Sequence, residues 1–350
     1  MQLTPPLCSR FFVSLAVLLM LTGESAAQSV SVETLSYGAN SAQRLDLHTP
    51  DSPPASPIPA VLLAHGGLWQ GGDKSALATL CNKIVVESEG AIACASMNYR
   101  LSQNLGGVCS APGVDTYSDQ VDDMALAYAF LLDQAATYSL DPTRLYVGGH
   151  SAGGHLSHEL NLRWDDYAQP CALPSGCPPT AGAIGFEGIY DIAAWDSYDD
   201  TFWGGQFACA TRKAFGAPPG ASPECLDSGY GEPCWSIGSP TYLAVYKDAL
   251  GISPAGDALI IHSPGDNWVD IAEATVFGAA MSAAFPDIEV VTSTDGSCAT
   301  GQHNDPLTQT TLATCIVNFV PEPSRFWMLA AGLGFLVTAA RVRSRDSAPD

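Results

Sequence analysis

The chain has 350 residues and a formal net charge of −22 at pH 7, with 14 Lys and Arg against 36 Asp and Glu. This shortage of basic residues argues against binding to the phosphates of nucleic acids, which requires clustered Lys and Arg. Hydrophobic residues make up 47% of the chain and charged residues only 14%, which excludes the disordered class. The length suits one large α/β domain.

The first 27 residues have the layout of a secretory signal peptide. Arg10 precedes an apolar run at 11–21, and the small residues at 25–27 follow this run. Because an apolar run of this length is shorter than the roughly 20 residues that cross a bilayer, export is favoured over a single spanning helix. We expect cleavage after Ala27.

Residues 320–350 form a second processing segment. A Pro-Glu-Pro motif at 321–323 precedes an apolar stretch at 326–340, predicted to be a membrane helix, and three arginines follow it: Arg341, Arg343 and Arg345. The arginines favour a cytoplasmic C-terminus, with the bulk of the chain outside. This segment resembles a bacterial PEP-CTERM sorting signal, and the resemblance implies processing by an exosortase. An ordinary tail anchor is the alternative and gives the same topology.

The chain contains 11 cysteines, and removal of Cys8 with the signal peptide leaves an even number. In an exported chain this favours disulfides over metal ligation. Cys171 and Cys177 bracket a loop with Pro and Gly, which favours a local pair, and the spacing leaves the other pairings open. No His-Cys cluster has the spacing of a zinc site, so the sequence predicts no metal.

Strand and helix patterns alternate from residue 29 to residue 319. This alternation predicts an α/β domain over 28–319, with a mainly parallel sheet and helices on both faces. The predicted strands lie at 29–37, 44–48, 60–64, 91–97, 144–148, 181–188, 258–262 and 288–294. The predicted helices lie at 74–88, 115–138, 152–162, 269–284 and 307–319.

Residues 191–239 interrupt this alternation. The segment holds several aromatic side chains, many Gly and Pro residues, and the cysteines Cys209, Cys225 and Cys234. A loop this long without regular structure usually has a function. Fifty residues also make a poor independent core. We therefore expect a disulfide-stapled insertion near the mouth of an active site and not a second domain.

The sequence Gly149-His150-Ser151-Ala152-Gly153 lies between a predicted strand and a predicted helix. A nucleophilic serine needs a sharp turn at this point to lift its hydroxyl above the sheet edge, and the flanking glycines leave room for neighbouring backbone. The amides that follow the serine point toward a developing oxyanion from the helix N-terminus. The motif predicts Ser151 as a nucleophile and Ala152 N–H as an oxyanion donor.

His65-Gly66-Gly67 ends an earlier buried strand. Stabilisation of an oxyanion requires backbone N–H groups that approach the substrate closely, which glycine allows. We expect Gly66 and Gly67 to supply this second part of the oxyanion hole. A simple Gly-Gly turn is the alternative.

These segments carry a family resemblance that covers almost the whole mature chain. Residues 65–69, 72–74, 98–101 and 149–154 resemble those of the α/β-hydrolase superfamily. Within it they are most similar to bacterial carboxylesterases of the feruloyl-esterase-like group and to kynurenine formamidases. The resemblance implies the α/β-hydrolase fold and a triad in the chain order Ser, Asp, His. It also implies catalysis without a cofactor.

The acid and the base are then sought after the nucleophile. Asp266 follows the predicted strand at 258–262 by about four residues, the position of the family's acid. Ser263 stands where the family usually has glycine, so Asp270 is kept as a reserve. His303 is the only histidine in the loop after the last predicted strand and is the predicted base, with an ordinary exposed loop histidine as the alternative.

The remaining histidines receive structural interpretations. His262 could compete as the base, but it precedes Asp266 at a position that the family fills structurally. His65 and His150 are expected to hold loop backbones by hydrogen bonds. The residues predicted to line the substrate pocket are Leu68, Trp69, His150 and Trp268.

The sequence thus predicts an exported serine hydrolase that cleaves carboxylic esters through an acyl-enzyme on Ser151. An exported enzyme would meet a small-molecule ester or a polymer-linked acetyl or feruloyl ester. One alternative is an amidase, formamidase or peptidase of the same fold. Another is an inactive, surface-attached binding protein, although the presence of Ser151, Asp266 and His303 argues against it.

Overall fold

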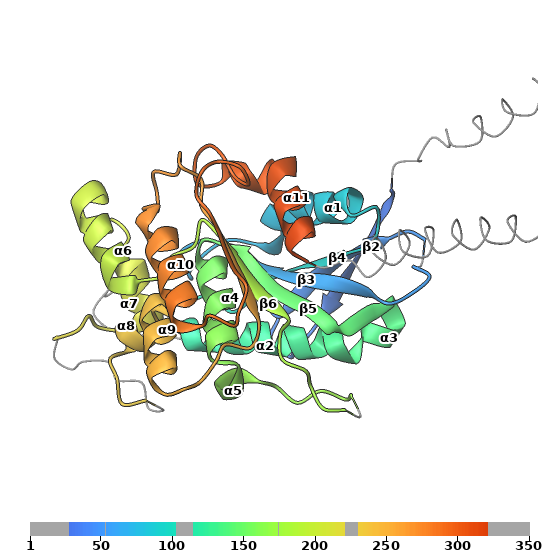
Figure 1. Ribbon diagram of the computed structural model, residues 1–350, viewed down its shortest axis with the longest axis horizontal. Coiled ribbons are helices and arrows are strands. Elements are labelled where there is room, and N and C mark those ends of the chain that lie inside the picture. Colours follow the sequence, from blue (N-terminus) through green and yellow to red (C-terminus); the bar gives the residue numbers. More distant parts are fainter. Residues whose placement is uncertain (1–27, 53, 103–114, 174, 221–229, 321–350) are drawn as a thin grey trace, which may run out of the picture.

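The computed structural model describes residues 28–52, 54–102, 115–173, 175–220 and 230–320 (Figure 1). The predicted signal peptide at 1–27 and the predicted helix at 326–340 lie outside these residues. In the part of the chain that is described, none of the helices has the length and apolar character needed to span a membrane.

One sheet of eight strands forms the centre, in the order β1-β2-β4-β3-β5-β6-β7-β8. The pairings β1 with β2 and β2 with β4 are antiparallel, and all the others are parallel. The strands are β1 (Val30–Ser36), β2 (Arg44–Pro50), β3 (Ile58–Ala64), β4 (Ala93–Met97), β5 (Leu140–His150), β6 (Gly182–Phe186), β7 (Asp257–Ile261) and β8 (Val290–Ser293).

Helices cover both faces of this sheet, and the α/β-hydrolase fold expected from the sequence is confirmed. The longer helices are α1 (Ala78–Glu87), α2 (Tyr117–Asp133), α4 (Ala152–Leu162), α7 (Ala208–Phe215), α9 (Pro240–Ala249), α10 (Ala272–Ala284) and α11 (Thr310–Phe319). The shorter ones are η1 (Lys74–Leu77), α3 (Ala135–Tyr138), α5 (Trp164–Tyr167), α6 (Ile192–Tyr198), the π-helix η2 (Asp199–Trp203), α8 (Cys234–Ile237) and η3 (Asp305–Thr308).

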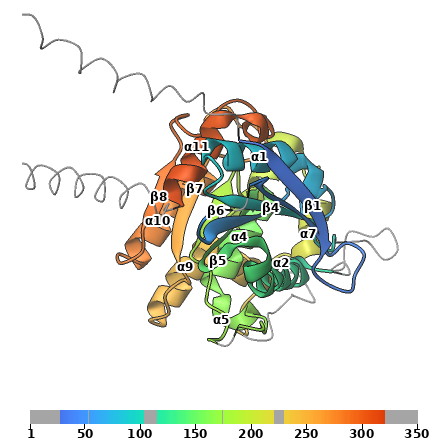
Figure 2. The ribbon, with the colours of Figure 1, turned by 90° about the vertical axis from the view of Figure 1, so that its right-hand side faces the viewer.

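The two faces of β3 explain why its sequence is apolar throughout. Every residue of this strand is buried. Val61 and Leu63 pack into a core with α1 and α11, whereas Leu62 and Ala64 pack into a second core with α2 and α4. The two helical layers lie on opposite sides of the sheet (Figure 2). A strand covered on both faces has no polar side, which produces the continuous apolar run.

The helix predicted at 115–138 is two helices. Thr116 and Asp119 form a capping box that starts α2. The backbone leaves helical dihedrals at Gln134, where φ is −91° and ψ is 1°, so α3 is a separate single turn.

The interval 191–239 is not irregular, and this expectation is wrong. Its described part contains α6, η2, α7 and α8. Asp191 caps α6 by accepting hydrogen bonds from the amides of Ala193 and Ala194. Helices of four to eight residues are too short for a periodic pattern to show in the sequence.

Disulfides link elements around the sheet. The predicted pair Cys171–Cys177 is present. Cys81–Cys94 joins α1 to β4, and Cys298–Cys315 joins the loop after β8 to α11. Cys209 and Cys234, in the segment predicted to be stapled, are disulfide-bonded as well.

The start of α4 packs directly against the end of β3. A Cβ atom on Gly153 would lie 2.1 Å from the carbonyl oxygen of Ala64, and one on Gly149 would lie 2.5 Å from the same atom. No side chain fits in this space, because the neighbouring atoms belong to backbone. These glycines therefore fix how closely the turn between β5 and α4 approaches the sheet.

We expect Gly153→Val to destabilise the fold by at least about 2 kcal/mol, because the added side chain must displace backbone of β3. Gly71→Ala is a suitable control, since the nearest atom to its new Cβ lies 3.7 Å away. Thermal and urea unfolding of both variants measures the difference. Equal stabilities would show that this close approach does not constrain the fold.

Candidate active site

Ser151 occupies the turn between β5 and α4 in a strained conformation. Its φ is 53° and its ψ is −118°, a region that costs a non-glycine residue free energy. Two hydrogen bonds hold the turn: Ser151 N–H donates to Phe186 O at 2.9 Å, and His155 N–H donates to Ser151 O at 3.1 Å. The turn thus presents Ser151 above the carboxyl ends of the strands.

The loop after β3 lies against this serine. A Cβ on Gly66 would lie 2.8 Å from the Cβ of Ser151, so only glycine allows this approach. Gly67 has a φ of +124°, and Leu68 and Trp69 that follow it also have positive φ. The backbone of Gly66 and Gly67 therefore borders the same space as Ser151. The amide of Ala152 is among the first N–H groups of α4, which lack partners inside the helix.

Two buried histidines hold the loops around Ser151, as expected. His65 Nδ1–H donates to Gly66 O at 2.7 Å, and the His65 ring stacks on Tyr99. His150 Nε2–H donates to the carbonyl oxygen of His303 at 2.8 Å. Burial lowers the pKa of His150 to about 3, so this ring stays neutral and its role is structural.

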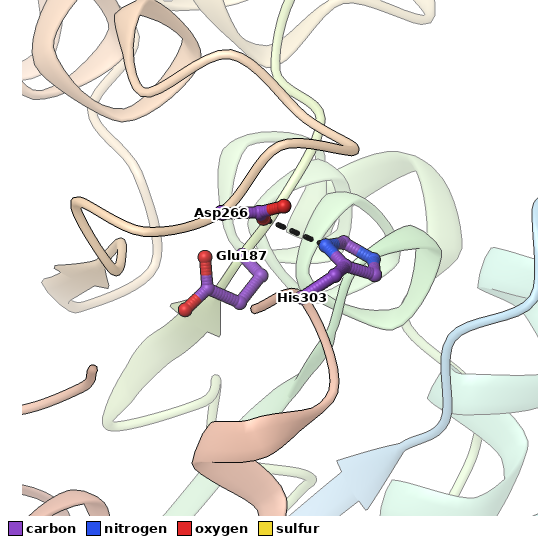
Figure 3. A group of neighbouring side chains, drawn as sticks. All are labelled: Glu187, Asp266 and His303. Carbon is purple, nitrogen blue, oxygen red and sulfur yellow. Dashed lines mark hydrogen bonds and ion pairs between the residues drawn. The ribbon is translucent and has the colours of Figure 1, made fainter. Parts of the chain in front are cut away.

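Asp266 and His303, far apart from Ser151 in the sequence, form a hydrogen-bonded pair (Figure 3), and His303 lines the same cavity as Ser151. The distance from His303 Nδ1 to Asp266 Oδ2 is 2.7 Å, and the side chain of Asp266 has no exposed surface. The amide of Trp268 donates to the other oxygen, Oδ1, at 2.8 Å. Because the proton on Nδ1 faces a carboxylate, Nε2 carries the lone pair that a general base requires.

The structure does not bring the two alternative residues to this position. Asp270 accepts a hydrogen bond at 2.9 Å from the N–H of Ala272, the first residue of α10. The side chain of His262 is fully buried behind Asp266, with Nε2 3.3 Å from Asp266 Oδ2. Neither residue lines the cavity that contains Ser151.

This cavity has a volume of about 320 Å³. Ser151 and His303 both line it, together with Gly66 and Gly67. Of the residues predicted for the pocket, three contribute to its wall: Leu68, His150 and Trp268. The exposed ring of Trp268 stacks on His303 with 7° between the ring planes and 5.8 Å between the centroids.

Trp69 does not line the cavity, so its assignment to the pocket is wrong. The side chain is completely buried, and its Nε1–H donates to His155 Nδ1 at 3.3 Å. Its ring also packs edge-on against Phe215 of α7. The aromatic residue after the two glycines therefore anchors the insertion to the domain.

Several residues of the site were not found from the sequence, among them Trp195 and Glu187. Trp195 of α6 lines the cavity, which confirms that part of the insertion lies near the site. Glu187, the first residue after β6, is fully buried next to Asp266 (Figure 3). An acidic residue near the end of the strand predicted at 181–188 could have drawn attention to it. An unpaired charge is costly at such a buried position.

Glu187, Asp266 and His303 have polar atoms within 4.8 Å of one another, a spacing that a metal ion could bridge. Hydrogen bonds, however, already satisfy the carboxylate oxygens. Glu187 accepts from Ser263 N–H, and Asp266 accepts from His303 and from the amide of Trp268. Both carboxyl groups therefore have hydrogen-bond partners within the protein itself.

The charges of the two carboxyl groups differ. Burial, followed by the hydrogen bond and the negative charge of Asp266, raises the pKa of Glu187 to about 9. Burial also raises the pKa of Asp266, but hydrogen bonds from His262 and His303 outweigh it and hold this pKa well below its usual range. Asp266 is thus the anion of the pair at neutral pH.

Several known proteins are similar to this chain. Residues 45–201 match the family described as BD-FAE. A kynurenine formamidase, avaC of Aspergillus versicolor, is 28% identical over 60% of this chain and 68% of that protein. A probable isoprenylcysteine alpha-carbonyl methylesterase of Oryza sativa subsp. japonica is 31% identical over 35% of this chain, but the chain spans only 26% of its length.

A solved carbohydrate esterase from gut microbiota has a similar fold, with a TM-score of 0.60 at 18% identity. The likeness covers 84% of this chain and 96% of that one. The chain therefore has the α/β-hydrolase fold. Esterases occur among its other relatives, of which the chain spans only about a third or less, and among the solved structures with a similar fold.

The sequence left open whether Asp266 or Asp270 is the catalytic acid, and substitution of each residue distinguishes the two. We expect Asp266→Asn to lower kcat for p-nitrophenyl acetate by about 10⁴-fold, because the neutral amide no longer fixes and stabilises the imidazole. Asp270→Asn should keep near wild-type activity, since Asp270 lies outside the cavity and accepts from an amide at the start of α10. The reverse result would transfer the role to Asp270.

Proposed function

We propose that the protein is an exported serine esterase that uses Ser151, Asp266 and His303 as its catalytic triad. One observation carries this proposal: a strained serine and a histidine that is hydrogen-bonded to a buried aspartate line the same cavity. The glycine backbone at the wall of that cavity supports the proposed oxyanion hole at Gly66, Gly67 and Ala152.

In the proposed reaction, Ser151 Oγ attacks the ester carbonyl carbon while His303 Nε2 takes the hydroxyl proton. The carbonyl oxygen becomes an oxyanion and accepts hydrogen bonds from the backbone amides of the oxyanion hole. His303 then returns the proton to the leaving alcohol, and an acyl group remains on Ser151. A water molecule, deprotonated by His303, releases the acid and restores the serine.

The residues that line the cavity indicate which kind of substrate it accepts. Aromatic rings of Trp195 and Trp268 border it, and neither lysine nor arginine is among its lining residues. An uncharged acyl group with an apolar or flat part suits this wall better than an anionic one. We propose a small-molecule or polymer-linked ester as the substrate. The relative that is a formamidase favours an aryl formamide as the second candidate.

We further propose that the chain is exported through its N-terminal segment and held at the cell envelope, at least transiently, by its C-terminal segment. The small residues at 25–27 and the Pro-Glu-Pro motif at 321–323 support this, with an exosortase as the processing partner. Sequencing of the protein from its native cells should give a mature N-terminus at Gln28. A retained Met1 would contradict export.

We expect Ser151→Ala to reduce kcat for p-nitrophenyl acetate by about 10⁶-fold, because the nucleophile is lost. Ser157→Ala is a matched control, since Ser157 is buried on the same helix and its hydroxyl donates only to the backbone oxygens of Gly154 and Ile184. Full activity of Ser151→Ala would exclude the proposed mechanism.

The substrate class is tested with the same two variants. Hydrolysis of p-nitrophenyl acetate, a feruloyl ester and an aryl formamide is compared at equal enzyme concentration. The proposal expects the highest kcat/KM with one of the two esters. A preference for the formamide that disappears in Ser151→Ala would favour the second candidate.

A further inference from the structure

A second carboxyl group, that of Glu187, lies behind the proposed acid. Glu187 follows β6 directly and has a φ of 53°, the left-handed region that a glutamate rarely adopts. Its side chain is turned into the protein and has no exposed surface (Figure 3). The left-handed backbone of Glu187 costs free energy, and the burial of its carboxyl group costs more. A residue that is kept in spite of both costs is expected to have a role beyond packing.

The contacts of Glu187 link it to the loop that carries Asp266. Ser263 N–H lies 3.0 and 3.1 Å from the two carboxyl oxygens of Glu187. His262 Nε2 lies 3.3 Å from Glu187 Oε2 and also 3.3 Å from Asp266 Oδ2. Glu187 therefore contacts both Ser263 and His262, which precede Asp266 in its loop, and a carboxyl oxygen of Glu187 lies within 4.8 Å of one of Asp266.

No strong positive charge balances this pair. Among the residues that the structure describes, no lysine or arginine forms an ion pair with Glu187 or Asp266. Two adjacent buried carboxylates without a cation repel each other strongly, so one of them keeps a proton. The partners then decide which one does.

Asp266 has the better partners for an anion. It accepts from His303 Nδ1 at 2.7 Å and from the amide of Trp268 at 2.8 Å, and it lies near His262. Glu187 accepts from the amide of Ser263 and lies equally near His262, at 3.3 Å, so it has one firm donor where Asp266 has two. We therefore expect Asp266 to be ionised and Glu187 to be protonated.

We propose that Glu187 is a positioning residue whose protonated carboxyl group donates a hydrogen bond to Asp266 and thereby keeps Asp266 ionised and aimed at His303. This inference rests on the proposed function, in which Asp266 orients the catalytic base. Raised in pKa to about 9 by burial and by Asp266, Glu187 stays protonated at neutral pH and loses its proton as the pH rises through that value.

Other titratable groups surround this pair. His150 and His158 stay neutral, because burial lowers the pKa of each to about 3. The groups that face Glu187 from neighbouring elements are Asp266 and His262 after β7, His303 after β8, Tyr190 in its own loop, and Glu273 on α10, which accepts from the amides of Tyr190 and Asp191. Burial raises the pKa of Glu273 to about 8, so it serves as a control for alkaline effects.

The test uses the full chain with Glu187→Gln, Glu187→Ala and Glu273→Gln. A glutamine amide donates to Asp266 and accepts from Ser263 in the geometry of a protonated glutamate. We expect Glu187→Gln to keep kcat/KM for p-nitrophenyl acetate within about threefold of wild type at neutral pH. Glu187→Ala should lose about tenfold or more in kcat with little change in KM, because the donor is absent.

The pH profile distinguishes this role from a purely structural one. Wild-type kcat/KM should fall as the pH rises through about 9, because ionised Glu187 repels Asp266. Glu187→Gln should lack this alkaline loss, and Glu273→Gln should retain it. The proposal is overturned if Glu187→Gln is as slow as Glu187→Ala. It is also overturned if Glu187→Gln shifts the acid limb of the profile, since that shift would mean that a negative charge was removed.

An infrared measurement does not depend on activity. The difference spectrum of resting wild type minus Glu187→Gln at neutral pH should contain the C=O stretch of a protonated carboxylic acid. Loss of carboxylate bands alone would overturn the proposal. A wild-type enzyme that shows this acid band but hydrolyses no ester would contradict the proposed function and leave the protonation of Glu187 intact.

Discussion

The tight turn at Ser151 is the constraint on which the arrangement of the site depends. The turn holds a serine at a φ of 53° because hydrogen bonds fix the backbone on both sides and because α4 approaches β3 without intervening side chains. Such strain persists only where the surroundings over-determine the conformation. The parallel strands supply those surroundings, since their carboxyl ends lie along one edge of the sheet.

The other parts of the site reach Ser151 through loops that follow these strands. The loop after β3 brings Gly66, and the loops after β7 and β8 bring Asp266 and His303. The loop of His303 is held twice, by the hydrogen bond from His150 and by the disulfide Cys298–Cys315, whose cysteines flank this loop in the sequence. Rigid support of this kind keeps a catalytic hydrogen bond in place before the substrate arrives.

The site depends on the charges of two buried carboxyl groups next to His303, those of Asp266 and Glu187. The chain carries a large negative net charge, yet amides and imidazoles stabilise Asp266 behind His303, and no lysine or arginine of the described residues pairs with it. The nearby Glu187 would add a second negative charge if it ionised. Because Glu187 is protonated, Asp266 is the one ionised carboxylate of this buried pair beside His303.

Much of the fold could be predicted from the sequence, because buried parallel strands and long amphipathic helices leave clear patterns. The apolar run that became β3 and the motif at Ser151 are examples, and the spacing of Asp266 after its strand depends on the same regularity. The short helices of the insertion left no pattern, since each has only about two turns or fewer.

Other features could not be predicted, because they depend on contacts between distant residues. Trp69 could not be assigned to the core without knowing that His155 and Phe215 surround it. Glu187 was missed for the same reason: only the fold brings the end of β6 next to the loop after β7. A lone acidic residue at the end of a buried strand is the signal that could have revealed it.

The most direct test of the central assignment is chemical labelling of the nucleophile, with the labelled residue identified by peptide mass spectrometry. A fluorophosphonate forms a covalent bond only with a serine activated by its neighbours. The account predicts one adduct, on the peptide that contains Ser151, and loss of that adduct in Ser151→Ala. Absence of labelling, or an adduct on another residue, would contradict it and favour an inactive binding protein of the same fold.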